Sequence, residues 1–453
     1  MGTWKDIRPQ FLPAVITMFL LLQVLFLVNM CYLYATQFRS TTRYRNFNLL
    51  YVDYDGGGVI GKSVTDAYQQ LRGEKFPTLL PESSSKYAQP EQIREAVCRG
   101  DYWGAIYTAD DGSAGLASAL ENGTSPPTSL TYIWNGVRYP VFSQAAVYSN
   151  ILKLIETTRS TYYTNNGSSV AASADLSNAA TLKAFLDPIQ AEEINIKGTE
   201  QGTRVFYNTV SMVMPILQQF FFMLALNGMS THFDTFTRLS WKANGLIRLI
   251  ASILYTLTGS LLMTGYIWAF RETWGQRESR FALTWVTMWL LMHTNFLSFD
   301  ITTALIPIQF MPFLVLTWVI LNVASTISPF ELNPKFFRWG YALPSHEAYQ
   351  VLIQIWSGGC NNRLYRALPI MFSWWIVRVP IAVDAMQHRC KAAVAAQEAL
   401  DHACLGGQSE AKYTATNETV TPVRGPGREH EQNGDSVEVV PLRDNGLGME
   451  PSK

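Results

Sequence analysis

FLPAVITMFLLLQVLFLVNMCYLY, residues 11–34, is the stretch of sequence that decides the fold. It runs for 24 residues without a charged side chain, and a helix of about 20 residues already crosses the hydrocarbon core of a bilayer. Bulky residues follow it, including Gln37, Phe38 and Arg39, whereas signal-peptide cleavage needs small ones. The sequence therefore predicts a retained transmembrane helix over residues 11–35, preceded by a cytoplasmic N-terminus over residues 1–10.

Five further apolar blocks follow after a long polar gap. The hydrophobic residues make up 48% of the chain although its mean hydropathy is only +0.04, so they must be concentrated in blocks. We expect a polytopic α-helical membrane protein with about six transmembrane helices, one plus five. The five-helix membrane domain spans residues 205–388, with an outer connection over residues 328–366. The blocks are Val205 to Leu226, Leu246 to Phe270, Phe281 to Leu297, about Pro307 to Ile327, and about Ala367 to Met386.

The polar gap has the pattern of a folded domain. The runs FNLLYVD (47–53), WGAIYT (103–108) and LTYIW (130–134) are typical of buried strands, and helical patterns separate them. This alternation predicts an inserted α/β domain with βαβ units over residues 38–204. Val141 to Tyr163 and Leu176 to Ile196 are expected to be helices that lead back to the membrane.

The C-terminal segment differs from everything before it. Residues 405–453 are rich in Gly, Glu, Arg, Pro and Thr and show no apolar periodicity. Such a segment cannot bury enough apolar surface to fold. We expect a disordered cytoplasmic tail.

Two glycosylation sequons support an extracytoplasmic position for the inserted domain. They are Asn122-Gly-Thr and Asn166-Gly-Ser. With six spans, both termini would then lie in the cytoplasm. The positive-inside count does not support this orientation, because more Lys and Arg residues flank the outer than the inner ends of the predicted spans.

Composition also excludes several functions. The 35 basic and 35 acidic residues balance. Nucleic-acid binding is not expected, because the sequence has no stripe of basic residues interleaved with aromatic ones. The five cysteines lack the spacing of a zinc site. We expect no metal, no cofactor and no catalytic residue.

Two motifs resemble those of a known family. Leu50-Tyr-Val-Asp-Tyr-Asp-Gly-Gly-Gly-Val-Ile-Gly-Lys-Ser63 resembles the start of the inserted domain in the fungal nitrosoguanidine-resistance membrane proteins. Ser328-Pro-Phe-Glu-Leu-Asn-Pro-Lys-Phe-Phe-Arg-Trp-Gly-Tyr-Ala-Leu-Pro344 is similar to that family's connection before the last helix. The family is similar to the permease subunits of type 2 ABC exporters. The resemblance implies an outer domain, cytoplasmic termini and a plasma-membrane protein that affects drug resistance.

Gly56 to Ser63 also matches the P-loop pattern GxxxxGK[ST], after a strand-like run and before a helical one. In a P-loop, backbone N–H groups and the lysine surround the phosphates. An extracytoplasmic domain would meet little nucleotide, and no other segment carries an ATPase signature. We therefore favour a glycine-rich turn, with Asp53 and Asp55 as turn residues.

Charged side chains in the apolar blocks are stronger candidates, because a charge at the bilayer centre costs about 2.5–3.5 kcal/mol. Arg378 lies near the middle of the last block; the alternative is that it extends to the cytoplasmic headgroups. His293 and Asp300 are seven residues apart and share a helical face. A proton-coupled cluster of His293, Asp300 and Arg378 is one hypothesis. An interhelical hydrogen bond for His293 and a helix-terminating role for Asp300 are the alternatives.

The second block carries polar residues that are either a substrate path or contacts between helices. Asn208 and Gln218 are ten residues apart and are expected near one face. Arg248, two residues inside the third block, is expected to be an interfacial anchor. Cys98 and Cys360 would both face the oxidising side, so they are candidates for a disulfide.

The leading hypothesis is a non-enzymatic, permease-like membrane protein that exports amphipathic compounds or lipids and so contributes to resistance to toxic compounds. The alternative is a non-transporting regulator or scaffold of lipid asymmetry, and a membrane ATPase using Gly56 to Ser63 is the least favoured. Expected partners are the lipid bilayer, small amphipathic molecules or lipids, and a second copy of the chain. The expected location is the plasma membrane, with other endomembranes as an alternative.

Overall fold

The computed structural model describes residues 4–198, 202–272 and 274–417. The chain begins with a long helix, α1 (Trp4–Gln37), which contains the predicted first span, and a short 3-10 turn, η1 (Ser40–Asn46). A sheet with its covering helices follows, and then a second group of helices. The chain divides into two units, residues 1–395 and 396–453.

Along the chain, a five-stranded sheet comes after α1 and before the later apolar helices. Its strands are arranged in the order β2-β1-β3-β4-β5. β1 (Asn48–Val52) pairs in parallel with both β2 (Thr78–Glu82) and β3 (Gly104–Thr108). β4 (Thr128–Trp134) is antiparallel to β3 and parallel to β5 (Gln190–Asn195). β1, β3 and β4 coincide with the three predicted strands. Residues 190–195 were expected in a helix, and that expectation is wrong.

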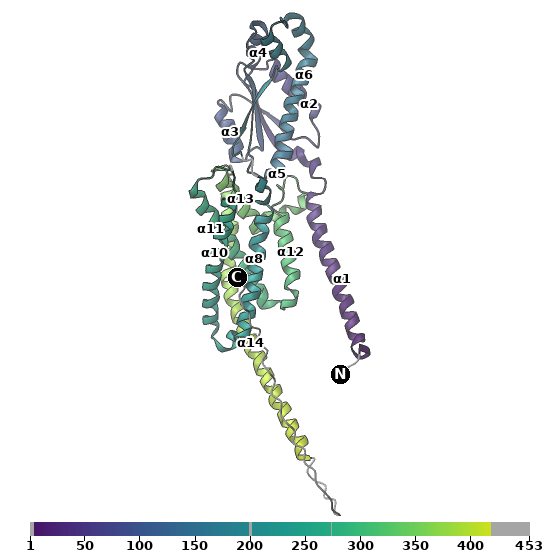
Figure 1. The fold of residues 1–453 in the computed structure, drawn as a ribbon, viewed down its shortest axis with the longest axis vertical. Coiled ribbons are helices and arrows are strands. Elements are labelled where there is room, and N and C mark those ends of the chain that lie inside the picture. Colours follow the sequence, from purple (N-terminus) through teal and green to yellow (C-terminus); the bar gives the residue numbers. More distant parts are fainter. Residues whose placement is uncertain (1–3, 199–201, 273, 418–453) are drawn as a thin grey trace, which may run out of the picture. The chain divides into compact units, whose positions relative to one another are not determined.

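Helices cover both faces of this sheet (Figure 1). Successive strand side chains point to opposite faces, so Leu49 and Tyr51 pack in one apolar cluster and Leu50 and Val52 in another. The first cluster is covered by α2 (Val59–Leu71), α4 (Gly112–Asn122) and α6 (Ser149–Ser173), and the second by α3 (Pro90–Arg99). The remaining elements are α5 (Pro140–Phe142), the π-helical η2 (Ser143–Tyr148) and α7 (Ala179–Leu186).

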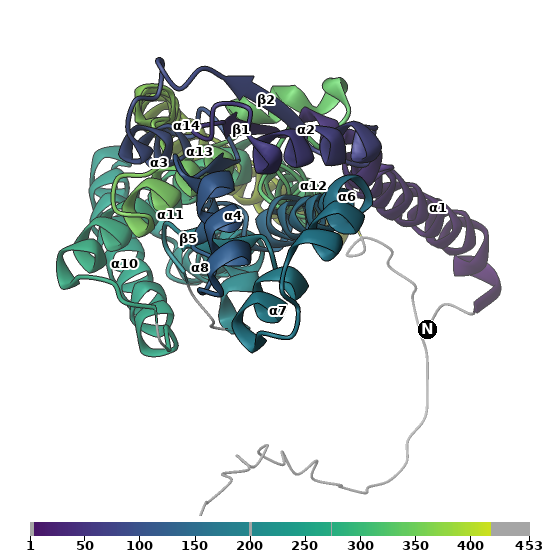
Figure 2. The ribbon, with the colours of Figure 1, turned by 90° about the horizontal axis from the view of Figure 1, so that it is seen from above.

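The second group consists mainly of apolar helices. α11 contacts α10 and α8, α8 contacts α12, and α12 contacts α1. In the view from above, α1 lies apart from α10 and α11 (Figure 2). The elements are η3 (Gly202–Phe206), α8 (Val210–His232), α9 (Thr235–Arg238), α10 (Trp241–Ala269), α11 (Glu278–Leu305), η4 (Ile308–Phe310), α12 (Met311–Ala324), η5 (Lys335–Ala342), α13 (Pro344–Trp356) and α14 (Leu364–Asn417).

Among the described residues, four helices are long and apolar enough to cross a membrane: Phe11–Gln37, Val210–His232, Trp241–Ala269 and Leu364–His402. α12, with 14 residues, is shorter than a span, and α11 is not among the four although it has 28 residues. A multi-pass helical membrane protein is therefore supported, whereas the count of six stays a prediction.

The last helix runs further than the sequence indicates. α14 continues to Asn417, into the segment that was expected to be disordered. Residues 418–453 lie outside the described residues, so the prediction of a disordered tail over that part stays a prediction, as does its cytoplasmic position.

Candidate functional site

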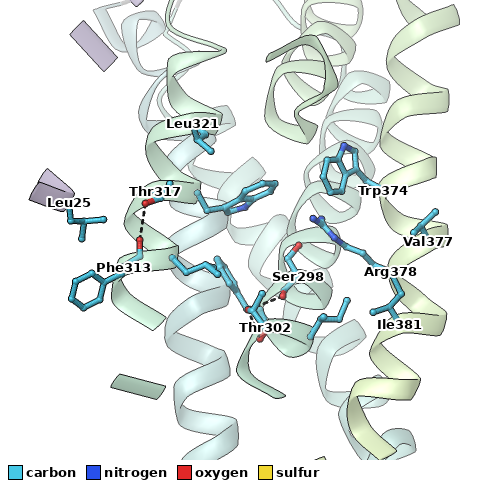
Figure 3. Close-up of a pocket in the computed structure, with 14 residues that line it drawn as sticks. Leu25, Ser298, Thr302, Phe313, Thr317, Leu321, Trp374, Val377, Arg378 and Ile381 are labelled. Carbon is cyan, nitrogen blue, oxygen red and sulfur yellow. Dashed lines mark hydrogen bonds between the residues drawn. The ribbon is translucent and has the colours of Figure 1, made fainter. Parts of the chain in front are cut away.

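An apolar cavity of about 700 Å³ lies among four of the apolar helices (Figure 3). Its walls come from α1 (Leu25), α11 (Ser298, Thr302), α12 (Phe313, Thr317) and α14 (Trp374, Arg378). The hydroxyl groups of Ser298, Thr302 and Thr317 donate to backbone carbonyls of their own helices. These hydroxyls therefore offer the cavity little polarity, and the wall is suited to an acyl chain or an aromatic body.

Arg378 is the charged residue among the described lining residues of this cavity. Its guanidinium lies over the ring of Trp374, 4.0 Å from the centroid, and 5.5 Å from the centroid of Trp318. Nη1 of Arg378 is buried and has no hydrogen-bond partner among the described residues. Because Trp374 precedes Arg378 by one helical turn, the side chain points toward the N-terminal end of α14. The side chain therefore points away from the C-terminal end of α14, the end at which the predicted topology puts the cytoplasmic headgroups.

A second cluster of charge surrounds Asp300 on α11. Oδ1 of Asp300 accepts hydrogen bonds from Nη2 of Arg248 on α10, at 2.7 Å, and from Nη1 of Arg389 on α14, at 3.0 Å. Arg389 also donates to the Asp300 carbonyl and to Thr303. Arg248 is 4% exposed, so its assignment as an interfacial anchor is wrong. One buried and one partly buried guanidinium group share one carboxylate, and the cluster ties three helices together.

The hypothesis of a His293, Asp300 and Arg378 cluster is not what the structure assembles. Arg389 rather than Arg378 reaches Asp300, because these two arginines are eleven residues, or roughly 16 Å of helix, apart on the same face of α14. The expected helix-terminating role of Asp300 is also wrong, since α11 continues to Leu305. An oppositely charged residue inside another apolar block was the signal that could have identified Arg248.

His293 lies in a smaller cavity of about 340 Å³ that Arg248 and Asp300 also line. Nε1 of Trp375 donates to Nδ1 of His293 at 2.7 Å, and Nε2 of His293 lies 3.2 Å from the Ser252 hydroxyl. An indole N–H can only donate, so Nδ1 is an acceptor and the imidazole is neutral with its proton on Nε2. His293 thus forms an interhelical hydrogen-bond bridge.

Asn208 and Gln218 do not share a helical face. Asn208 precedes the first residue of α8, where helical periodicity does not apply, and its amide donates to the carbonyls of Thr326 and Ile327 beyond the end of α12. Gln218 lies on α8 beside Gly259 and lines a separate cavity of about 420 Å³. Asn208 is therefore a contact between segments, and Gln218 borders a different space from Arg378.

Next to the glycine-rich loop from Gly56 to Ser63, the carboxylates of Asp53 and Asp55 accept hydrogen bonds from neighbouring groups. Asp53 accepts hydrogen bonds from the N–H of Gly57, at 3.0 Å, and from Thr108. Asp55 accepts from the N–H of Ser113 at the start of α4, at 2.9 Å. Two carboxylates in this position repel a phosphate and occupy donors that a P-loop would offer it. The geometry favours a turn that joins β1 to α2 and caps α4.

The proposed covalent and modification sites lie in the sheet domain and next to α13. A disulfide joins Cys98, in α3, to Cys360, between α13 and α14. Asn122 is exposed at the end of α4, where its side-chain amide bonds Ser118. Asn166 is half-buried within α6. A glycosylation acceptor must be accessible at the surface, so Asn122 is the better placed of the two.

Comparison with known proteins gives a family. The family model described as a protein of unknown function (DUF3533) matches residues 18–379. An uncharacterised endoplasmic reticulum membrane protein of Saccharomyces cerevisiae is 25% identical over 287 residues, a match that covers 58% of this chain and 55% of that protein. No solved structure matches. The matched region extends from the middle of α1 into α14, across both the sheet and the apolar helices, and the chain therefore belongs to the DUF3533 family.

Proposed function

We propose that the chain is a permease-like protein that binds amphipathic compounds or lipids with an anionic head in the Arg378 cavity and moves them out of the membrane or across it. The observation that carries this proposal is an apolar cavity of about 700 Å³ with one charged lining residue, whose Nη1 lacks a hydrogen-bond partner among the described residues. An apolar wall suits the body of such a molecule, and a guanidinium suits a phosphate or carboxylate head.

The cavity walls also suit movement. α1 contacts α12. Among the described residues, the Asn29 amide donates to Thr317 of α12 at 3.2 Å, and the Gln37 amide donates to Ser328, beyond the end of α12, at 2.7 Å. Hydrogen bonds between membrane helices average about 0.6 kcal/mol. A displacement of α1 would therefore open this wall at small cost, whereas α10, α11 and α14 are joined through the Asp300 cluster.

The kinship to nitrosoguanidine-resistance proteins and to type 2 ABC exporter permeases is part of this proposal. The order of the elements along the chain supports it, because one apolar helix precedes the sheet domain and the other apolar helices follow it. For the location, the name of the yeast relative favours the endoplasmic reticulum over the plasma membrane. We propose an endomembrane or plasma-membrane protein that contributes to resistance by handling such molecules.

The test is transport in proteoliposomes that contain the purified full chain. The probe is a fluorescent phosphatidic acid, compared with a fluorescent phosphatidylcholine, and the readout is its rate of transfer between leaflets. We expect transfer of the anionic probe, a loss of at least tenfold in Arg378→Gln, and partial retention in Arg378→Lys. Lys391→Gln, at an exposed position on the same helix, is the matched control and should transfer at the wild-type rate.

A non-transporting regulator or scaffold is the rival, and the same experiment separates the two. If the wild-type chain transfers neither probe but binds the anionic one, and Arg378→Gln abolishes that binding, the cavity is a lipid site without transport. If Arg378→Gln and wild type behave alike in both assays, the proposal is wrong.

A further inference from the structure

A separate, polar pocket of about 100 Å³ lies where the sheet domain meets α13 and the residues around it. The sheet domain contributes Trp103, Arg138 and Tyr139, and the later segment contributes Glu331, His346 and Arg366, among others. The Cys98–Cys360 disulfide ties these two parts together, and the N–H of Asn362 donates to the Arg99 carbonyl at 3.2 Å. The pocket is therefore part of a covalently fixed junction.

Arg138 is the residue that most needs an explanation. It follows β4, is 8% exposed, and its Nη1 is buried without a hydrogen-bond partner among the described residues. Its guanidinium stacks 3.7 Å from the centroid of the Trp103 ring, and burial lowers its pKa. No carboxylate lies within ion-pair distance of Arg138 in the described part of the chain. A buried, unpaired charge of this kind costs several kcal/mol, which an anion bound in the pocket would offset.

Two further arginines line the same pocket. Arg366 lies 4.4 Å from the centroid of the Tyr341 ring and forms a 3.0 Å ion pair with the buried carboxylate of Glu347. Arg363 lies beside the Gly100 carbonyl, with Nη2 at 3.5 Å. The carboxylate facing these groups from the lining is Glu331. Even with Glu347 included, three guanidinium groups oppose two carboxylates, so the site carries an excess of positive charge.

His346 contributes a hydrogen-bond acceptor that has no donor in the part of the chain that the structure describes. Its Nδ1 lies 2.7 Å from the Ser325 carbonyl, which can only accept, so Nδ1 carries the proton. Nε2 is then a lone-pair acceptor, and it is buried without a partner among the described residues. A fully deprotonated carboxylate ligand offers no hydrogen to such an atom, whereas a hydrogen phosphate carries a P–O–H group that can donate to it.

We propose that this pocket binds a phosphate group, as free hydrogen phosphate or as the monoester headgroup of a lipid, through Arg138, Arg363 and Arg366, with His346 Nε2 accepting from its hydroxyl. The space fits this class: at roughly 30 Å³ for each water, about 100 Å³ holds one tetrahedral oxyanion, so the rest of a lipid monoester would lie outside the pocket. The site is separate from the Arg378 cavity and does not depend on transport.

The experiment measures the thermal midpoint, Tm, of the purified full chain in detergent with the disulfide intact. Inorganic phosphate is titrated at constant ionic strength against chloride, and the chain in nanodiscs is compared with phosphatidic acid and with phosphatidylcholine. We expect phosphate to raise Tm with saturation, and Arg138→Gln and Arg363→Gln each to raise the half-saturating concentration at least tenfold. Arg94→Gln, at an exposed position on α3, is the control and should respond as wild type.

A second readout separates binding from a structural role. Without phosphate, Arg138→Gln removes an unpaired buried charge, so its Tm should equal or exceed that of wild type. A response to phosphatidic acid alone, lost in both variants, identifies the lipid as the source. The proposal is overturned if neither probe shifts Tm, or if both variants respond as wild type does. If Arg138→Gln fails to fold, Arg363→Gln decides between these outcomes.

Discussion

At the scale of single residues, the cluster around Asp300 holds unequal numbers of positive and negative charges. Arg248 and Arg389 share Asp300, so the cluster carries a net positive charge. Pairing and hydrogen bonds to Asn227 and Thr303 reduce the cost of burying it. Asp300 is thus the residue on which the junction of α10, α11 and α14 depends.

Removing that carboxylate should destabilise the helices strongly. Asp300→Asn leaves two guanidinium groups buried without a counter-charge, and breaking a buried pair in this way costs about 3–5 kcal/mol. We expect a lower Tm in detergent and a lower yield of folded chain. Asp384→Asn, at an exposed position on α14, should leave Tm unchanged. Equal Tm values for Asp300→Asn and wild type would show that the cluster contributes nothing to stability.

Glu347 gives the protein a pH dependence of known sign. Burial raises the pKa of this carboxyl to about 7, against the opposing effect of Arg366. Because the folded state holds the proton more tightly than the unfolded state, stability is full below about pH 4.5 and falls as pH rises to 7, by an amount on the order of 3 kcal/mol. Glu347→Gln removes this loss. The Tm difference, variant minus wild type, should therefore be larger at pH 8 than at pH 5.

His346 changes stability with pH in the opposite direction to Glu347, so the two effects must be separated. Burial lowers the pKa of His346 to about 3, so the unfolded state takes up a proton that the folded state does not, and stability falls as pH drops below about 6.5. In Glu347→Gln this loss in acid remains alone. A Tm difference that is constant from pH 5 to pH 8 would contradict the assignment of Glu347.

At the scale of elements, the central strands were predictable and the edge strands were not. β1, β3 and β4 carry apolar runs because they are covered on both faces. β2 and β5 lie at the two edges of the sheet, and β5 (QAEEIN) is too polar to predict a strand. Similarly, the sequence showed which apolar blocks hold charges. It did not show that Asp300 pairs with Arg389 rather than with Arg378, because this depends on how far along α14 Asp300 lies once the helices pack.

The loop between β1 and α2 yields a prediction that separates a turn from a nucleotide site. Asp55 caps α4 through the Ser113 N–H, so Asp55→Ala should lower the free energy of unfolding by about 0.5–2 kcal/mol. Lys62→Ala should leave the free energy of unfolding unchanged. If the wild-type chain binds ATP and this variant does not, the turn interpretation is wrong.

The disulfide is the covalent link between α3 and the segment before α14. Its two cysteines are separated by 262 residues, and closing a loop of 100 residues or more stabilises a fold by about 4–5 kcal/mol in the chain-entropy model. Cys98→Ser should therefore lower Tm by several degrees and change the mobility on non-reducing gels. Cys31→Ser, which removes an exposed free cysteine, is the control. Identical mobility of Cys98→Ser and wild type would exclude the link.

At the scale of the whole molecule, the proposals share one assumption about sidedness. A disulfide persists in an oxidising compartment, and the Asn122 sequon is used only in the secretory lumen or outside. We therefore propose that the sheet domain, residues 38–204, lies on the extracytoplasmic side, although the distribution of Lys and Arg does not favour this orientation.

Protease protection of the full chain in sealed microsomes tests this placement most directly. Protease is added from the cytoplasmic face, and the fragment that carries the sheet domain is detected with an antibody against that domain, before and after the membrane is opened with detergent. We predict a protected fragment that shrinks on endoglycosidase treatment in wild type but less in Asn122→Gln, and that is digested once detergent is added. Digestion of the sheet domain while the membrane is still sealed would contradict the account.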